Sequence, residues 1–131
     1  MKHLYIILLV LPLLGFGQNE YIKEYYKNGQ LKFEGYLDKD QIPQGLIKTY
    51  YKNGQLNFEG FVKDGWEHGS AKGYYENGQL EFEGNFKNGK KNGLMKTYYK
   101  NGQLEFEGNY KDAQIISHKC WDTNGNKIDC E

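Results

Sequence analysis

The sequence has no arginine, only two prolines and two cysteines among its 131 residues, and its 17 lysines balance 17 acidic residues. A chain with zero formal net charge lacks the basic surplus of a nucleic-acid-binding protein and the acidic surplus of a charged tail. Two cysteines are too few for a disulfide-rich miniprotein. Tyrosine and glycine are abundant instead, with 12 and 17 residues. Aromatic residues separated by glycine-containing turns are typical of short β-strands.

The first 17 residues have the features of a secretory signal peptide. A positive start at residues 1–3 precedes an apolar run at residues 4–14, and Gly15, Phe16 and Gly17 supply a small-x-small cleavage pattern. The apolar run is shorter than the roughly 20 residues that a transmembrane helix needs. We predict cleavage near Gly17, which exports residues 18–131 to the periplasm or the medium. An uncleaved membrane anchor is the alternative.

A repeat fills the rest of the chain. Each copy contains Tyr-Tyr, one further residue, Asn-Gly-Gln-Leu, another residue, and Phe-Glu-Gly, and successive Asn-Gly glycines lie 25, 24 and 24 residues apart. A period in this range indicates an array in which each copy is one supersecondary unit. We place the copies at about 21–45, 46–69, 70–93 and 94–117, followed by a partial capping hairpin at 118–131. The repeat turns are Asn28-Gly29, Asn53-Gly54, Asn77-Gly78 and Asn101-Gly102.

Each copy is predicted to form a β-hairpin, because Asn-Gly favours a two-residue type I′ turn. Such a turn at Asn53 and Gly54 places Tyr51 opposite Leu56. It also places lysine opposite glutamate in every copy, as expected for cross-strand partners. These pairs are Lys23–Glu34, Lys48–Glu59, Lys72–Glu83 and Lys96–Glu107. The predicted fold is all-β, an elongated single-layer antiparallel meander of four to five hairpins.

Alternation of side chains gives each hairpin two unlike faces. The predicted apolar face carries Ile22, Tyr26, Leu31, Phe33 and Leu37; Ile47, Tyr51, Leu56, Phe58 and Val62; Ala71, Tyr75, Leu80, Phe82 and Phe86; and Met95, Tyr99, Leu104, Phe106 and Tyr110. The opposite face carries the lysine–glutamate pairs and is predicted to be solvated. It also carries Tyr25, Tyr50, Tyr74 and Tyr98. One glycine per copy falls on the apolar face, where the missing side chain lets a neighbouring aromatic ring lie over the strand or lets the sheet coil.

The repeated unit, clearest at residues 74–93, resembles the MORN repeat variant of bacterial proteins, and the resemblance extends over residues 21–112. It implies an elongated single-layer β-sheet that acts as a scaffold and in some proteins contacts lipids. Many bacterial chains with this repeat are catalogued as antitoxins of toxin–antitoxin pairs. The resemblance therefore implies an antitoxin-like or immunity-like role as one form of scaffold function.

The two cysteines, Cys120 and Cys130, flank the last turn. A three-residue loop at residues 124–126 would place them directly opposite each other, and in an exported chain we predict a disulfide. A pair of free thiols or a redox site is the alternative, although no Cys-x-x-Cys motif supports it. Asp122, Asn124 and Asn126 match the first half of a calcium loop, but Lys127 occupies the position that requires glycine. We interpret this segment as an Asn-Gly turn and predict no metal and no cofactor.

The sequence places no nucleophile, base and orienting group together, so we predict no enzymatic activity. Two classes of binding function remain. In the first, the aromatic face or the sheet edges bind another protein or a second copy of the chain. In the second, the face with lysine and tyrosine contacts a membrane surface or a glycan. No nucleic acid is expected as a partner.

Overall fold

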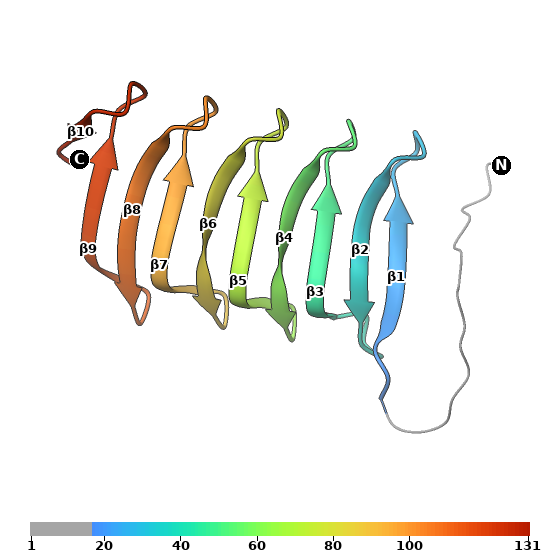
Figure 1. Cartoon of the computed structure of the whole chain (residues 1–131). Helices are drawn as coiled ribbons and strands as arrows, with labels where there is room; N and C mark the ends of the chain where they lie inside the picture. Colours follow the sequence, from blue (N-terminus) through green and yellow to red (C-terminus); the bar gives the residue numbers. More distant parts are fainter. Residues whose placement is uncertain (1–16) are drawn as a thin grey trace.

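The computed structural model describes residues 17–131, which form one ten-stranded antiparallel sheet (Figure 1). The strands are β1 (Glu20–Tyr25), β2 (Leu31–Leu37), β3 (Pro43–Tyr50), β4 (Leu56–Lys63), β5 (Trp66–Tyr74), β6 (Leu80–Lys87), β7 (Lys90–Tyr98), β8 (Leu104–Lys111), β9 (Gln114–Trp121) and β10 (Lys127–Ile128). Each strand pairs with its neighbours in sequence, which confirms the predicted all-β meander. The predicted signal peptide lies outside the described residues except for Gly17. Residues 17–131 contain no helix of the length and apolarity that crossing a membrane requires.

The Asn-Gly turns close three-residue loops. In the second repeat, the Tyr51 N–H donates to the Gln55 carbonyl at 2.8 Å and the Gly54 N–H donates to the Tyr51 carbonyl at 2.9 Å. Gly54 has a φ of 88°, whereas the φ of Asn53 is not positive. This is a type I turn followed by a left-handed glycine, so the predicted type I′ turn is wrong. The Asn53 Oδ1 accepts the Gln55 N–H at 2.9 Å, which holds the type I geometry locally.

A β-bulge follows each turn and restores the predicted register. Tyr50 pairs with Leu56, but Thr49 pairs with Phe58, so Asn57 is an additional residue on β4. Beyond the bulge, lysine lies opposite glutamate in every repeat. The predicted pairs Lys23–Glu34, Lys48–Glu59, Lys72–Glu83 and Lys96–Glu107 are confirmed.

The same bulge moves one leucine per repeat to the other face of the sheet. Directly opposed residues of an antiparallel pair share a face, so Leu56 lies beside Tyr50 rather than beside Phe58. The corresponding pairs are Tyr25–Leu31, Tyr74–Leu80 and Tyr98–Leu104. The predicted position of Leu31, Leu56, Leu80 and Leu104 on the apolar face is therefore wrong. The cause is the extra loop residue and its bulge, which a two-residue turn does not contain.

The apolar face is partly covered by its own side chains. Leu37, Val62, Ala71 and Met95 are only 8, 7, 2 and 3% exposed, respectively. A Cβ placed on Gly108 would lie 2.6 Å from the Phe106 Cζ, because the phenylalanine ring lies over the glycine. The predicted packing of an aromatic ring over the strand glycine is confirmed at Gly35, Gly60 and Gly108, whereas the Met95 side chain lies over Gly84. In a sheet with one layer, this cover takes the place of a second layer.

Two side chains per repeat bind each hairpin to the next. The Tyr51 hydroxyl donates to the Tyr74 carbonyl at 2.6 Å, and the Asn53 Nδ2 donates to the Glu76 carbonyl at 3.0 Å. The equivalent bonds are Tyr26–Tyr50, Tyr75–Tyr98, Tyr99–Trp121, Asn28–Lys52, Asn77–Lys100 and Asn101–Thr123. Each asparagine thus closes its own turn and also binds the next one, which aligns the turns along one side of the sheet (Figure 1).

The terminal hairpin contains the predicted Cys120–Cys130 disulfide, with the two Cα atoms 5.4 Å apart. Its loop comprises residues 123–125, since the Asp122 N–H donates to the Asn126 carbonyl. Cys120 therefore pairs with Ile128, and the cysteines are not directly opposite each other as predicted. The disulfide instead holds the chain beyond the end of β10.

Gly108→Ala should lower the free energy of unfolding by about 1 to 3 kcal/mol, because the new methyl group overlaps the Phe106 ring. In a Phe106→Leu background the ring is gone, and the same substitution should cost clearly less. Urea denaturation of the four chains measures this coupling. An equal cost of Gly108→Ala in both backgrounds would contradict the packing of ring over glycine.

Reduction of the disulfide should lower the free energy of unfolding by about 2 to 3 kcal/mol, because the unfolded chain is no longer constrained. Urea denaturation with and without reductant measures the loss, and amide exchange should locate it in β9 and β10. The double variant Cys120→Ser/Cys130→Ser is the control and should not respond to reductant. Unchanged stability of the native chain after reduction would show that the disulfide does not stabilise this end.

Candidate functional site

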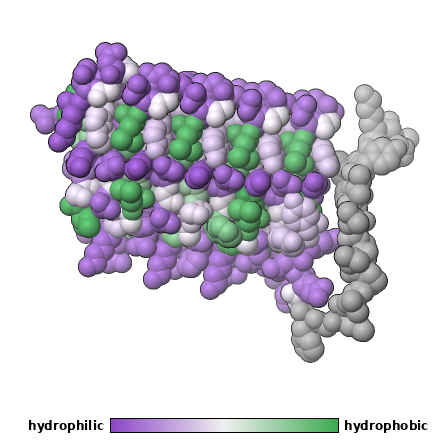
Figure 2. Space-filling view, viewed as in Figure 1, coloured by the Kyte–Doolittle hydropathy of each residue, from purple (hydrophilic) through white to green (hydrophobic). Residues whose placement is uncertain are grey.

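One face of the sheet, which we call the charged face, carries a row of alternating lysine and glutamate across nine strands. Each member lies opposite the next on the neighbouring strand, and the row runs Lys23, Glu34, Lys48, Glu59, Lys72, Glu83, Lys96, Glu107, Lys119. Figure 2 shows it as a continuous hydrophilic band across the middle of the molecule. Every interior lysine lies between two glutamates, and a lysine stands at each end, so the row holds five lysines and four glutamates.

Three of the four tyrosines predicted as a binding face donate hydrogen bonds to this row. The hydroxyl groups of Tyr50, Tyr74 and Tyr98 donate to the preceding repeat's glutamate at 2.7, 2.9 and 2.8 Å, respectively. Tyr25 lies on the first strand, so within residues 17–131 no preceding repeat supplies a glutamate to it. Its side chain is 43% exposed. The structure therefore brings three of these tyrosines into internal bonds and leaves the fourth at the edge.

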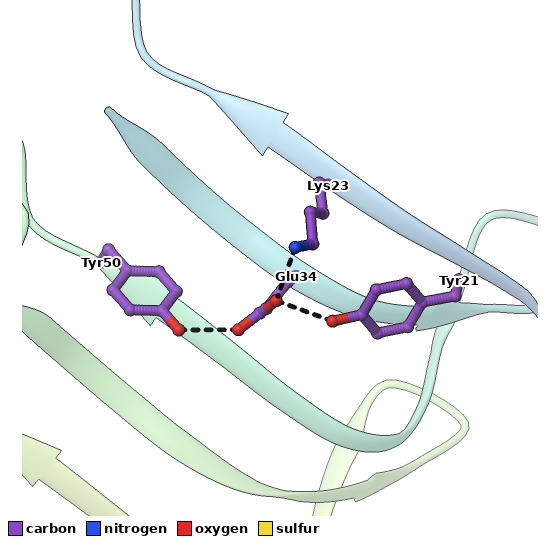
Figure 3. A network of polar contacts seen from close by, with 4 residues as sticks. All are labelled: Tyr21, Lys23, Glu34 and Tyr50. Atoms are coloured by element: carbon purple, nitrogen blue, oxygen red, sulfur yellow. Dashed lines mark hydrogen bonds and ion pairs between the residues drawn. The ribbon is translucent and has the colours of Figure 1, made fainter. Parts of the chain in front are cut away.

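Glu34 is the most heavily bonded carboxylate of the row (Figure 3). Its Oε2 accepts the Tyr21 hydroxyl at 2.7 Å and lies 3.6 Å from the Lys23 Nζ, while its Oε1 accepts the Tyr50 hydroxyl at 2.7 Å. Tyr21 was not among the residues predicted for this face, because it lies outside the repeated pattern. The available signal was its position two residues before Lys23, which places both side chains on one face of a strand.

These hydrogen bonds change the pKa values of both partners. Burial, followed by the hydrogen bond to glutamate, raises the pKa of three tyrosines to about 12: Tyr50, Tyr74 and Tyr98. For Tyr21, the hydrogen bond to Glu34 is the main cause of a pKa raised to about 12. Conversely, the hydrogen bonds from Tyr21 and Tyr50 hold the pKa of Glu34 below its usual value. A carboxylate held as an anion and already bonded is a poor general acid.

Exposed apolar side chains lie beside the charged row in the first two repeats. The rings of Tyr21 and Tyr36 meet edge to face with centroids 5.0 Å apart, and Leu46 lies opposite Phe61. We call these four residues the apolar patch; each is between 43 and 49% exposed. Figure 2 shows hydrophobic residues on the other side of the hydrophilic band from the repeat turns. The predicted charged face is therefore not uniformly polar.

The pairing of Leu46 with Phe61 is not repeated in the later hairpins, although Leu94 occupies the position of Leu46 in the fourth, opposite Asn109. In the third hairpin the positions of Leu46 and Phe61 are occupied by Ser70 and Asn85, which also lie opposite each other. This face was predicted to be solvated because its periodic residues are charged. The comparison of Leu46 and Phe61 with Ser70 and Asn85 in the aligned copies was the signal that could have identified the patch.

The segment that matches half of a calcium loop forms a turn. The Asp122 Oδ1 accepts the N–H groups of Asn124 and Asn126, each at 2.9 Å. The Asn126 bond is the main cause of an Asp122 pKa below its usual value. Within residues 17–131, no three His, Cys, Asp or Glu side chains gather as a metal site would require. Asp122 here accepts the N–H of the residue after the turn glycine, a bond that the turn asparagine accepts in the other repeats.

Tyr74→Phe should lower the free energy of unfolding by about 1.5 kcal/mol at pH 8, because it removes a hydrogen bond to a carboxylate. A tyrosine whose folded-state pKa is about 12, against an ordinary value of 10, stabilises the fold fully below pH 10. This contribution is lost as the pH rises from 10 towards 12. Urea denaturation between pH 8 and 11.5 should therefore show declining stability, and a shallower decline for Tyr74→Phe.

Tyr25→Phe is the matched control for that experiment, because Tyr25 has the same position in the repeat without a preceding glutamate. It should change stability and its pH dependence little. Equal effects of Tyr25→Phe and Tyr74→Phe would contradict a stabilising role of the tyrosine–glutamate bond.

The hairpins coincide with segments of a known repeat. The model of the MORN repeat variant family matches residues 22–39, 43–64, 67–88 and 91–112, which together are more than half of the chain. Each matched segment covers one hairpin, from β1–β2 to β7–β8. The chain matches no curated protein. Repeats of this family generally form non-catalytic scaffolds that mediate interactions with proteins or membranes. The chain belongs to the MORN repeat variant family.

Proposed function

We propose that this protein is an exported, non-enzymatic scaffold that binds another protein through its charged face, with the apolar patch at the centre of the contact. An antitoxin-like or immunity-like role is one form of this function. The observation that carries the proposal is the apolar patch itself, where Tyr36, Leu46 and Phe61 are exposed beside a row of alternating lysine and glutamate. Exposed apolar groups with a polar rim are typical of protein-binding surfaces.

The two faces differ in what they offer to a partner. On the apolar face, Leu37, Val62, Ala71 and Met95 are buried beneath neighbouring side chains. On the charged face, the apolar patch has no such cover from residues 17–131. A hollow of about 180 Å³ adjoins the patch and is lined in part by Leu46, Phe61, Ser70 and Lys72. This hollow can accept a side chain of a partner.

A membrane surface or a glycan is less well supported as the ligand. Anionic lipids attract clustered lysines, whereas each interior lysine of the charged row lies between two glutamates. The tyrosine hydroxyls that could bind a sugar are already donated to glutamate at three of the four positions. The partner that fits the remaining exposed groups is a protein.

Two observations support export. Residues 1–17 have the pattern of a signal peptide. The Cys120–Cys130 disulfide is the form that a pair of cysteines takes in an oxidising compartment. Residues 18–131 are then the mature scaffold.

The double variant Leu46→Ser/Phe61→Asn should lose at least tenfold in recovery of the partner, because it copies the polar pair Ser70 and Asn85 of the next hairpin into the apolar patch. The measurement is affinity capture from the native envelope fraction, with quantitative mass spectrometry. Ile116→Ser is the control, since it removes an exposed apolar group on β9, where Ile116 is 66% exposed. Equal recovery by the double variant, or binding of liposomes or glycans without any reproducible protein, would overturn the proposal.

A further inference from the structure

The outer edge of β1 lacks the neighbour that every equivalent strand has. The strands β3, β5, β7 and β9 each pair on this side with the last strand of the preceding hairpin. At β3, that neighbour supplies Glu34, which lies opposite Lys48 and accepts the hydroxyl of Tyr50. Within residues 17–131 no strand occupies the corresponding side of β1.

The first strand nevertheless carries the repeat's binding groups. Lys23 and Tyr25 have the positions that Lys48 and Tyr50 have in β3, since both lysines lie opposite the glutamate of their own hairpin. Lys23 therefore has a glutamate on one side only. The carbonyl of Tyr25 corresponds to that of Tyr50, which accepts a tyrosine hydroxyl from the preceding repeat. The outer edge of β1 is therefore equivalent to the edge of β3 that pairs with β2, but no strand of the described chain pairs with it.

We propose that the edge of β1 binds an extended acidic segment of another protein, which adds antiparallel to β1 and places a carboxylate between Lys23 and Tyr25. The backbone of the added segment would complete the sheet, as in other cases of strand addition. Its carboxylate would take the place that Glu34 has between Lys48 and Tyr50. This inference rests on the proposed protein-binding function and assigns the chemistry of one part of the partner.

Charge selects a foreign segment rather than a second copy of this chain. The alternating row begins with Lys23 and ends with Lys119. Any pairing of two copies edge to edge that continues the row places lysine against lysine. Like charges directly opposite each other destabilise a strand pair, and edge lysines protect sheets from such association. A carboxylate on the added strand would instead continue the alternation.

The other end of the sheet does not offer the same site. There β10 pairs with Trp121 and Cys120, and the disulfide holds the chain beyond it. Asp122 stands at the position where the other repeats have the tyrosine that donates to the next hairpin. The last hairpin therefore has no hydroxyl at this position to donate to a further strand. Of the two ends of the sheet, only β1 has both the lysine and the tyrosine of the repeat at an edge that no other described strand occupies.

The test uses a fluorescein-labelled peptide with the sequence of residues 79–86, which contains all of β6 except its last residue and carries the Glu83 that pairs with Lys96 of β7. Fluorescence anisotropy during titration with the purified protein should show saturable binding. Lys23→Glu should weaken binding at least tenfold, and Tyr25→Phe should weaken it severalfold. A peptide with Glu83→Lys should bind Lys23→Glu better than it binds the native protein. Lys63→Glu makes an equal charge change at an exposed residue at the end of β4, and it should keep native affinity.

Three outcomes would overturn the proposal. The first is that the native protein binds the peptide no better than a scrambled peptide. The second is that Lys23→Glu and Tyr25→Phe both keep native affinity. The third is a native dimer, in size-exclusion chromatography, that Lys23→Glu dissociates, because a second copy would then occupy the edge. Tyr25→Phe removes one hydroxyl only, so it remains informative if Lys23→Glu does not fold.

The peptide experiment also separates this inference from the proposed function. Leu46→Ser/Phe61→Asn leaves Lys23 and Tyr25 in place, so it should bind the peptide with native affinity. Loss of partner recovery by that double variant with peptide binding retained would support both proposals. Normal partner recovery by Lys23→Glu, together with absent peptide binding by the native protein, would refute the edge site and leave the scaffold function standing.

Discussion

The three-residue Asn-Gly loop and the bulge that follows it determine most of this structure. The loop puts one residue more at each turn than a two-residue hairpin contains, and the bulge takes up that residue on the second strand. As a result, lysine stays opposite glutamate, while leucine joins tyrosine on the charged face. The loop asparagine also reaches the next turn, and the tyrosine before the loop donates to the next hairpin. One local conformation therefore sets the register, both faces and the stacking of repeats.

The structure could be predicted from the sequence where a repeated pattern was compatible with only one register of the strands. The lysine–glutamate pairs recur in four copies, so an error in register would have placed them apart in all four. The spacing of Cys120 and Cys130 about a turn was enough to predict their disulfide, though not the offset between them. Asn-Gly alone does not distinguish a two-residue loop from a three-residue loop, because both use a glycine with positive φ. That ambiguity led to the wrong face for four leucines.

The binding surfaces lie where the sequence departs from the repeat. The periodic groups bind one another: lysine faces glutamate, tyrosine donates to glutamate, and phenylalanine covers glycine. Leu46 and Phe61 are exposed on the charged face, and the next hairpin has the polar Ser70 and Asn85 at their positions. Tyr25 is exposed because no earlier hairpin stands before it in the described chain. A pattern averaged over copies finds the scaffold and hides these exceptions, so the apolar patch emerges only when the copies are compared position by position.

The central claim is that the loop and bulge place leucine beside the first tyrosine of each pair. Nuclear Overhauser spectroscopy tests it directly, because Tyr50 and Tyr51 point to opposite faces of the sheet. We predict contacts between the Tyr50 ring and the Leu56 methyl groups, with the equivalent contacts in the other repeats. Contacts between the Tyr51 ring and Leu56, with none from Tyr50, would show a two-residue turn and contradict the account.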